Sequence, residues 1–589
     1  MDAAAAVDEL RSAGIGPGDP VALVVHDGAV AMATSVWSAQ WSALRSAHAE
    51  QVLGAVDEEL APRWVVWSQA TARRLAGDGV RLTRCWDVAA VHRLLFGDTR
   101  DDPAHVWARL HGLSSGDLPV TAPDDLFHQA ADDAALSAPV RPDGYLDPEW
   151  VDGGWATSPD RAAAWARLLA EVGTLQRDAI ERVAAEHDRP MAVRTAYAES
   201  TAELLCAELA ADGLPMDRAA MEDLIGGYVG PRPRSPQDAD ERRDALDESV
   251  LRHVQGGVRF DLRSPSQVRS MLRMVGVEVP DTRAWRLERV RDAHPLVPAL
   301  LRWRKAERVR TTFGYGWLDE SLGADGRFRG EWSGSDGAAG RMTASSGLHN
   351  MPADLRRGVA AEPGHVFVRA DLGQIEPRVL AAVSGDRALA AASLADDLYA
   401  PVAAELGVDR ATAKVAVLGA MYGQTSGEGG RALVGLRRSY PVAMEYLDAA
   451  DRAAQVGTDL RTYGGRLVRM GSAALGEPGQ PGSLGDREAR SRAAARGRYG
   501  RNAMVQGAAA ELFKVWAVTV RARGRSMDAR VVLCLHDELL VHVPAERADD
   551  AAEMVDDALQ EAAARWAPDR SVRFLSDTSI VSTWADAKD

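Results

Sequence analysis

The chain has 589 residues, of which 46% are hydrophobic and 26% charged, and its formal net charge is -16 at pH 7. This length predicts about three or four domains, and the hydrophobic content excludes a mainly disordered protein. The cysteines, Cys85, Cys206 and Cys534, have no paired spacing, which excludes a disulfide scaffold and a cysteine zinc site. The net acidity argues against a uniformly basic nucleic-acid-binding protein. It leaves open a local basic groove, because net charge does not describe charge distribution.

The first residues carry acids where a signal peptide needs a basic region followed by an apolar stretch. No uninterrupted apolar run approaches the roughly 18 residues that a membrane-spanning helix requires. We therefore expect a cytoplasmic protein without a membrane partner.

The first 190 or so residues have the pattern of an α/β unit. Residues 20–37 predict two strands around a His26-Asp27-Gly28 turn, and RWVVWS near residue 65 predicts another strand. Helical spacing follows at residues 88–95 and 160–172.

Long helices rich in Ala, Leu, Glu and Arg begin near Glu199, and Gly213 suits the C-terminus of the first of them. Residues 228–244 predict a proline-rich charged loop, and residues 300–317 predict a helix with several basic side chains. The composition of residues 475–486 predicts an exposed, mobile loop.

An acid follows an apolar strand pattern at residues 366–371, which predicts a half-buried strand with Asp371 at its C-terminal end. Ile375, Val379 and Val383 then recur every four residues and predict a helix, in which Pro377 is tolerated because it lies in the first turn. Taken alone, an Asp in this position is more often a solvated residue at a strand end.

A second acidic element lies at residues 531–543, where two apolar runs flank His536-Asp537-Glu538. Two strands joined at this polar turn would bring its acids to the edge of a sheet. Asp371 and Asp537 would then offer two carboxylates from separate strands. A pair of Mg²⁺ ions roughly 3.5–4 Å apart requires such ligands for phosphoryl-transfer chemistry.

Between the two acidic elements, Arg410, Lys414, Leu418 and Tyr422 are each four residues apart. They form one stripe along a predicted helix, with two cations followed by an apolar side chain and an aromatic ring. This order fits a nucleoside triphosphate whose phosphates lie at Arg410 and Lys414 and whose sugar and base lie toward Leu418 and Tyr422.

Together these elements resemble motifs A, B and C of family A DNA polymerases, the class of bacterial DNA polymerase I. The matching segments are DLGQIEPR, RATAKVAVLGAMYG and HDE, in the family's order and with its spacing. The segments AGRMTASSGLHNMP at residues 339–352 and RYGRNAMVQGAAAELFK at residues 498–514 are similar to two further family motifs. The resemblance covers about residues 196–589.

The resemblance implies a multidomain protein of α/β and α+β class: an RNase H-like, exonuclease-type N-terminal domain followed by a right-hand polymerase. The expected parts are the exonuclease-like domain at residues 1–195, a thumb at 196–335, a palm with an antiparallel sheet at 336–386 and 503–589, and helical fingers at 387–502. The basic helix near residues 302–310 falls where the family's thumb grips the duplex.

Position by position, the resemblance also implies roles for individual residues. Asp371 and Asp537 would bind two Mg²⁺ ions, with Glu538 beside them and Lys414 among the catalytic groups. Gln374, Glu376, Arg410, Lys414, Leu418 and Tyr422 would contact the nucleotide, and Glu376 would close the pocket below its sugar. The primer-template duplex would be contacted by Arg341, Arg498, Asn502, Gln506 and His536.

Some positions depart from the family pattern. Leu418 replaces the usual aromatic residue against the sugar, Val417 replaces a common Asn, and Leu372-Gly373 replace Tyr-Ser. These departures affect the expected substrate affinity and sugar selectivity more than the chemistry.

The N-terminal domain lacks the carboxylates of the family's 3'-5' exonuclease, which needs a D-x-E on its first strand and two further Asp residues. The first strand, residues 21–25, contains no acid, and the D-x-E at Asp57 and Glu59 follows a helix-like segment. We interpret Asp57 and Glu59 as surface charges. Asp87 resembles a second exonuclease segment but cannot hold two metal ions alone, so we expect an inactive domain.

The sequence therefore predicts a monomeric, cytoplasmic, nucleoid-associated DNA polymerase that acts in DNA replication or repair on primer-template DNA and dNTPs. The alternatives are a single-subunit RNA polymerase, a catalytically impaired DNA-binding paralogue, and a bifunctional enzyme with an active exonuclease. Glu376 argues against the first of these, and retention of Asp371, Asp537, Arg410 and Lys414 argues against the second.

Overall fold

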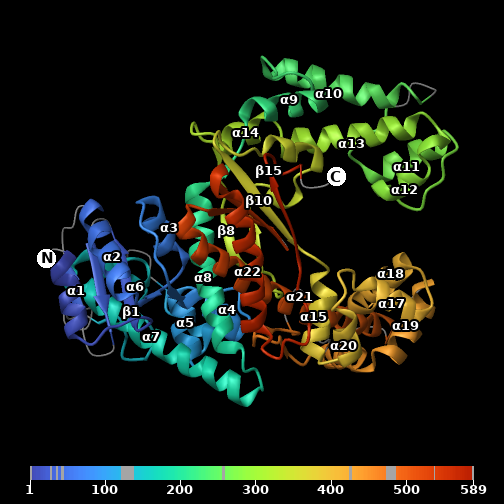
Figure 1. Cartoon of the computed structure of the whole chain (residues 1–589). Helices are drawn as coiled ribbons and strands as arrows, with labels where there is room; N and C mark the ends of the chain where they lie inside the picture. Colours follow the sequence, from blue (N-terminus) through green and yellow to red (C-terminus); the bar gives the residue numbers. More distant parts are fainter. Residues whose placement is uncertain are drawn as a thin grey trace. The chain divides into compact units, whose positions relative to one another are not determined.

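The computed structural model describes residues 3–26, 29–34, 38–41, 46–120, 138–254, 259–423, 428–471, 486–535 and 537–586 (Figure 1). Its contacts divide the chain into two compact units. Unit 1 comprises Met1–Asp212, Glu331–Thr343 and Val368–Ile580, and unit 2 comprises Gly213–Gly330, Ala344–Phe367 and Val581–Asp589. The expected boundary at residue 195 does not separate these units, because the helix across it remains within unit 1 up to Asp212.

The N-terminal part of unit 1 is built on a mixed sheet whose strands run in the order β3-β2-β1-β4-β5. Strand β1 pairs antiparallel with β2 and parallel with β4, and β4 pairs parallel with β5. The strand bounds are β1 Pro20–His26, β2 Ala29–Ala33, β3 Ser38–Trp41, β4 Arg63–Val66 and β5 Cys85–Asp87. The predicted strands at residues 20–37 and near residue 65 are confirmed as β1, β2 and β4, whereas the turn at residues 27–28 lies outside the described residues.

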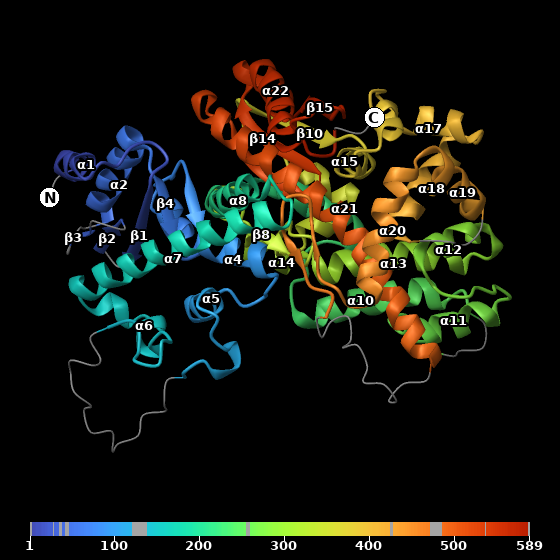
Figure 2. The same cartoon turned by 90° about the horizontal axis from the view of Figure 1, so that it is seen from below.

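Helices cover both faces of this sheet. Successive side chains of a strand point to opposite sides, so each strand contributes to the apolar packing on both faces. Ala22 and Val24 of β1 belong to one apolar cluster with Trp165 of helix α7, and Val21 and Leu23 belong to another. Figure 2 shows α7 lying along β1, β2 and β4, in agreement with their contacts. The helices of this part are α1 Ala3–Ser12, α2 Ser46–Leu60, α3 Gln69–Gly77, α4 Val88–Phe96, α5 Pro103–Leu110, α6 Pro148–Val151 and α7 Pro159–Glu186.

The predicted helices at residues 88–95 and 160–172 are confirmed as α4 and α7, although α7 continues to Glu186. The interpretation of Asp57 as a surface charge is wrong. Asp57 lies in α2, is buried, and accepts hydrogen bonds from Nε1 of Trp64 at 2.8 Å and from the backbone N–H of Thr83 at 3.0 Å. Glu59, two residues later on the same helix, is half-exposed and pairs with Arg11 at 3.0 Å.

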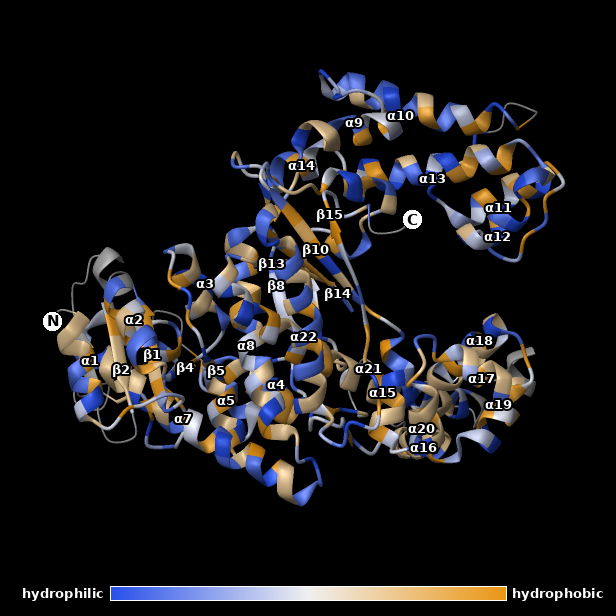
Figure 3. Cartoon of the chain, viewed as in Figure 1, coloured by the Kyte–Doolittle hydropathy of each residue, from blue (hydrophilic) through white to orange (hydrophobic). Residues whose placement is uncertain are grey.

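A second sheet in unit 1 has the strand order β13-β14-β10-β15, with β13 antiparallel to β14. The bounds are β10 His365–Leu372, β13 Arg530–Leu535, β14 Glu538–Pro544 and β15 Ser576–Val581. Helix α22, Ala548–Trp566, contacts β14, and helix α21, Asp486–Gly524, contacts β13. Apolar colouring runs along β10 in Figure 3. The predicted strand before Asp371 and the predicted pair of strands at residues 531–543 are therefore confirmed.

The strand before Asp371 is not half-buried, which corrects the expectation from alternation. Phe367, Val368, Arg369 and Ala370 are all buried, so both faces of the central strand β10 are covered. Arg369 occupies a position that the alternating pattern assigned to solvent.

A group of helices follows β10, beginning with the predicted helix after Asp371. They are α15 Ile375–Ser384, α16 Arg387–Ala392, α17 Tyr399–Leu406, α18 Arg410–Tyr422, α19 Glu428–Ser439 and α20 Pro441–Gln455, and the hairpin β11 Leu460–Arg461 and β12 Leu467–Val468 comes next. Helix α21 runs without interruption through residues 502 and 503, where the expected boundary between fingers and palm lies. The loop predicted at residues 475–486 lies almost entirely outside the described residues.

Unit 2 contains its own apolar core, formed by residues such as Val268, Leu272, Leu300 and Trp303. Its helices are α9 Arg218–Val229, α10 Pro236–Leu251, α11 Pro265–Met274, α12 Ala284–Arg289, α13 Leu296–Thr312 and α14 Tyr315–Ser321. The short strands are β6 Leu214–Pro215 and β7 Arg327–Phe328 in unit 2, and β8 Trp332–Asp336 and β9 Arg341–Ala344 near the boundary of unit 1.

Two expectations for unit 2 need correction. The charged loop predicted at residues 228–244 is mostly helical, because Ser235 accepts a hydrogen bond from the N–H of Asp238 and Pro236 takes the first helical position of α10. The basic helix predicted at residues 300–317 ends at Thr312, and α14 begins at Tyr315. A Cβ at Gly314 would lie 2.8 Å from the carbonyl oxygen of Arg310, so the chain turns there on a glycine.

Two buried ion pairs join helix α8, Ala192–Asp212, to helix α21 within unit 1. Nζ of Lys514 donates to both carboxylate oxygens of Glu199 at 2.7 Å, and Arg466 approaches the same carboxylate at 2.5 Å. About two turns further along α21, Arg521 donates to both oxygens of Glu208. Burial acts to raise the pKa of Glu199, but Arg466 and Lys514 hold that pKa below its ordinary value.

Among the described helices, none contains an apolar stretch of the length and hydropathy needed to cross a membrane.

The α8–α21 contact generates a stability prediction. Glu199→Gln leaves the buried ammonium of Lys514 and the guanidinium of Arg466 without their carboxylate, so we expect a loss of about 3–5 kcal/mol in the free energy of unfolding. Denaturant unfolding followed by circular dichroism measures the change. The matched control is Glu59→Gln, which removes an exposed partner of Arg11 and is expected to change stability far less. Equal unfolding midpoints for the two variants would contradict the structural role of Glu199.

Candidate functional site

Asp371 and Asp537 lie at one end of the strands of the β13-β14-β10-β15 sheet. Asp371 is the penultimate residue of β10, and Asp537 lies in the tight turn between β13 and β14. The N–H of Leu372 donates to the carbonyl oxygen of Asp537 at 2.9 Å, which fixes the end of β10 against that turn. The two predicted acids are therefore brought together by backbone pairing.

The carboxylates of these two residues interact electrostatically. Burial raises the pKa of Asp537 to about 6, and the negative charge of Asp371 contributes in the same direction. Two partly buried carboxylates that repel each other in this way form an oxygen-rich site suited to a hard divalent cation.

Arg369 joins two acids at this end of the sheet from its interior. Its Nε donates to Oε1 of Glu538 at 2.5 Å, and its Nη2 donates to Oδ2 of Asp371 at 3.2 Å. Arg369 and Glu538 are 2% and 7% exposed, so the guanidinium provides the counter-charge that a buried carboxylate needs. Glu538 thus shares Arg369 with Asp371 and directly follows Asp537 in the chain.

Helix α18 carries the predicted stripe on the side turned away from its packing face. Asp409 accepts from the N–H of Thr412 and caps the start of the helix, and Gly423 with φ 69° ends it. Buried Ala413, Ala416, Val417, Ala420 and Met421 form the packing face. Arg410 and Lys414 are exposed, and Leu418 and Tyr422 are half-buried.

Asp397 connects two of the predicted nucleotide-binding residues. Nε2 of Gln374 donates to Oδ1 of Asp397 at 2.8 Å, and the guanidinium of Arg410 donates to the same carboxylate. The hydrogen bond from Arg410 lowers the pKa of Asp397. Gln374 adopts a left-handed backbone with φ 54°, and its side-chain oxygen accepts from the N–H of Leu398 at 2.8 Å. The start of α15 is thereby held against the start of α17.

Glu376 lies at the centre of a polar cluster that faces α18. The hydroxyl of Tyr422 donates to Oε2 of Glu376 at 2.8 Å, and Nη2 of Arg341 donates to Oε1 at 3.2 Å. Burial raises the pKa of Tyr422, and the hydrogen bond to Glu376 adds to that effect, whereas Gln506 of α21 acts in the opposite direction. The structure therefore brings together Arg341, Glu376, Tyr422 and Gln506, which the sequence had assigned to two different ligands.

Residues Arg498, Asn502 and Gln506 follow one another at four-residue spacing along α21, so they share a face of that helix. Arg498 is exposed and its Cγ would lie 2.7 Å from a Cβ at Gly423, which brings it next to the end of α18. Asn502 and Gln506 are half-buried. His536, predicted as a duplex contact, lies outside the described residues.

Arg369 and Asp397 are site residues that the sequence reasoning missed. The sequence signal for Arg369 was an arginine within an apolar strand pattern. No local pattern distinguishes Asp397 from its neighbour Asp396, because its partners, Gln374 and Arg410, are 23 and 13 residues away.

In the N-terminal sheet, the acids considered for an exonuclease site have structural partners. Oδ1 of Asp87 accepts from the N–H of Ala90 at 2.8 Å and caps α4. Burial, and then the charge of Glu203, raise the pKa of Asp87 well above its ordinary value. Asp57 is held by Trp64 and Thr83, and Glu59 is paired with Arg11 at the surface.

Comparison with known proteins gives a consistent result. The sequence model of DNA polymerase family A matches residues 234–586. DNA polymerase I of Deinococcus radiodurans is 26% identical over 496 residues, covering 77% of this chain and 46% of that protein. The thermostable DNA polymerase I of Thermus thermophilus is 28% identical over 491 residues, covering 77% of this chain and 56% of that protein. The chain thus spans about half the length of these curated relatives.

Among solved structures, the chain is similar to the POL domain of Pol1 from M. smegmatis in complex with DNA primer-template and dNTP. The TM-score is 0.67 at 20% sequence identity, and the alignment covers 100% of both chains. At this identity the likeness establishes the fold, and it extends over the N-terminal sheet as well as the second sheet and the helices.

Proposed function

Because the chain belongs to DNA polymerase family A, we propose that it extends the 3' end of a DNA primer with deoxynucleotides paired to a template strand. The proposal rests on Asp371 and Asp537, whose carboxylates interact at one end of the strands of the β13-β14-β10-β15 sheet. The polymerase names of the curated relatives support it as well. In this proposal residues 1–195 form an exonuclease-like domain, and the thumb, palm and fingers have the extents given above.

Asp371 and Asp537 would hold two Mg²⁺ ions, because their carboxylate oxygens are the ligands that hard cations prefer. Such ions, when bound, lower the pKa of the primer 3'-hydroxyl and stabilise the charge of the leaving pyrophosphate. Arg369 positions the carboxylate of Asp371 and keeps Glu538 neutralised, so that Glu538 need not be compensated by a ligand.

Helix α18 would bind the incoming dNTP along its exposed stripe. Arg410 and Lys414 would contact the phosphates, and Leu418 and Tyr422 would contact the sugar and base. Asp397 holds the guanidinium of Arg410 beside Gln374, which keeps one phosphate-binding cation close to the end of β10. Leu418 offers a smaller apolar contact than an aromatic ring would.

Glu376 and Tyr422 would exclude ribonucleotides. Their hydrogen bond of 2.8 Å and the contact of Glu376 with Arg341 hold both side chains in a fixed arrangement. A ribose 2'-hydroxyl would collide with this pair or disturb its hydrogen bonds.

Two groups of residues would contact the duplex. Arg341, Arg498, Asn502, Gln506 and His536 would contact phosphates and minor-groove acceptors in unit 1. In unit 2, helix α13 buries Leu300, Trp303 and Val309 while Arg302, Lys305 and Arg308 remain exposed. That exposed face would contact the phosphate backbone without reading sequence.

The first prediction about activity concerns the metal ligands. Asp371→Asn or Asp537→Asn is expected to lower the primer-extension rate by at least about 100-fold, because each change removes a charged ligand, while duplex affinity stays largely intact. Single-turnover extension and a filter-binding assay measure the two quantities. Asp577→Asn, an exposed change on β15, is the control. Extension by either site variant at more than about a tenth of the parent rate would refute the metal assignment.

The second prediction concerns sugar choice. Glu376→Ala removes the carboxylate that orients Tyr422, so ribonucleotide use relative to dNTP use is expected to rise about tenfold or more. Steady-state kcat/KM for each nucleotide measures the ratio. The control is Glu405→Ala at an exposed position of α17. An unchanged ratio in Glu376→Ala would show that Glu376 does not select the sugar.

The third prediction is that the protein does not shorten a primer from its 3' end. Two-metal hydrolysis needs several carboxylates at one site, whereas Asp57 is held by Trp64 and Thr83 and Asp87 caps α4. The assay uses a mismatched 3' end with Mg²⁺ or Mn²⁺ and without dNTPs.

The Asp371→Asn variant is the control for pyrophosphate-driven reversal in that assay. Shortening that persists in this variant, and is lost on changing Asp57, Glu59 or Asp87, would establish a working exonuclease and contradict the proposal.

A further inference from the structure

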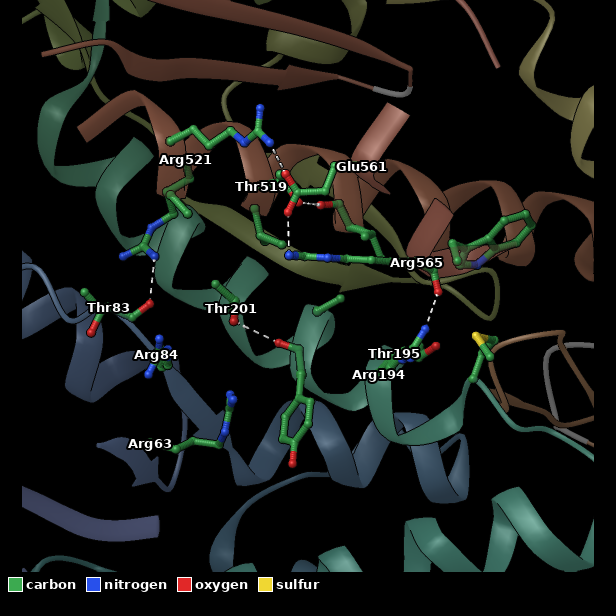
Figure 4. Close-up of a pocket in the computed structure, with 18 of the residues that line it drawn as sticks. Arg63, Thr83, Arg84, Arg194, Thr195, Thr201, Thr519, Arg521, Glu561 and Arg565 are labelled. Atoms are coloured by element: carbon green, nitrogen blue, oxygen red, sulfur yellow. Dashed lines mark hydrogen bonds and ion pairs between the residues drawn. The ribbon is translucent and has the colours of Figure 1, made fainter. Parts of the chain in front are cut away.

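A cavity of about 570 Å³ lies within unit 1 between the N-terminal sheet and the helices α8, α21 and α22 (Figure 4). Its lining residues include none of those assigned above to the nucleotide, the duplex or the metal ions. Arginine is the predominant charged residue type in its walls. The cavity is therefore a distinct basic site.

Some of these arginines are neutralised by carboxylates. Arg523 and Arg565 share the single carboxylate among the described lining residues, Glu561, and Arg521 pairs with Glu208 behind the wall. One acid for two cations leaves the α21–α22 side of the cavity with excess positive charge.

Four further arginines are held by main-chain carbonyl groups. Arg63 donates to the carbonyl of Cys85 at 3.3 Å, Arg84 to that of Ala61 at 3.0 Å, Arg194 to that of Arg565 at 2.8 Å, and Arg525 to that of Arg81 at 2.6 Å. In the part of the chain that the structure describes, none of these four forms an ion pair with a carboxylate.

A carbonyl group positions a guanidinium without cancelling its charge. Burial lowers the pKa of Arg63 and of Arg525, and the positive charge of Arg521 lowers the pKa of Arg525 further. An anion in the cavity would supply the missing charge.

We propose that this cavity binds a small anion with several linked phosphate groups, such as inorganic tripolyphosphate or the triphosphate of a free nucleotide. Guanidinium groups bind phosphate oxygens through pairs of parallel hydrogen bonds. Figure 4 shows Arg63 and Arg84 on one side of the cavity and Arg194 and Arg565 on another. A chain of linked phosphates carries oxygens along its length for several guanidinium groups, and the volume is within the range of about 300–1,000 Å³ typical of small-ligand sites.

The aromatic residues of the cavity favour a small ligand over single-stranded nucleic acid, which binds proteins through a continuous basic groove and exposed stacking rings. The guanidinium of Arg63 lies 3.8 Å from the ring centroid of Tyr197 and covers one face of that ring. Trp566 is only 2% exposed. Neither ring offers an open platform for successive bases.

The test is calorimetric titration of the full chain with tripolyphosphate in EDTA, which prevents metal-dependent binding at Asp371 and Asp537. All proteins carry Lys414→Ala, so that the phosphate site proposed on α18 is weakened. The double variant Arg84→Gln/Arg194→Gln changes two exposed side chains, and Arg182→Gln, exposed on α7, is the matched control. We expect the double variant to lower affinity at least about tenfold and the control to leave it unchanged.

A second arm replaces tripolyphosphate with dATP, and tighter binding of dATP would identify a nucleotide as the natural source of the phosphates. The absence of saturable binding of both ligands would overturn the proposal. Binding that Arg84→Gln/Arg194→Gln does not weaken would also overturn it. A third contradicting result is binding of a single-stranded oligonucleotide that requires these arginines and is not displaced by either small ligand. Thermal melting of each variant confirms that it is folded. Primer extension is measured separately, because the cavity does not depend on the proposed polymerase activity.

Discussion

The buried ion pairs between α8 and α21 are the contact on which unit 1 depends. Glu199 and Glu208 of α8 meet Lys514 and Arg521 of α21, and Arg466 adds a second cation to Glu199. Arg521 also donates to the carbonyl of Leu82 in the N-terminal part of the unit. Charges in such a setting are costly unless each has its partner, so moving α8 away from α21 would leave buried charges unpaired. These contacts thereby link parts of unit 1 that are distant in the sequence.

The candidate site gains its geometry from this crossing and from the second sheet. Helix α21 continues from the ion pairs at Lys514 back to Gln506, Asn502 and Arg498, which lie near Tyr422 and Gly423 at the end of α18. Strand pairing fixes Asp371 against Asp537, and Arg369 fixes Glu538 beside them. The acids are therefore set by backbone and buried side-chain contacts, whereas Arg410 and Lys414 on α18 remain exposed to a ligand.

Two acids in the N-terminal part of unit 1, Asp57 and Asp87, have structural partners. Asp57 joins α2 to Trp64 and Thr83, and Asp87 caps α4 while its oxygen lies buried near Glu203. The same region contributes Arg63 and Arg84 to the basic cavity. A domain whose carboxylates serve packing can thus still present charged groups to a ligand, at a position away from the carboxyl ends of its strands.

Local periodicity in the sequence determined the strand that carries Asp371 near its end, the hairpin at Asp537 and the α18 stripe. These features depend on alternation, on spacing of four residues, or on turns of a few residues, so each can be read from one segment. Tertiary structure alone decided the burial of Arg369 and Asp57 and the pairing of Asp397 with Gln374 and Arg410. It also decided the buried ion pairs between α8 and α21 and the gathering of arginines around the cavity. In each case the partner that stabilises the charge is distant in sequence or lies on another element. Polar burial depends on that partner and not on the local pattern, so the pattern placed Arg369 on an open strand face and Asp57 at the surface.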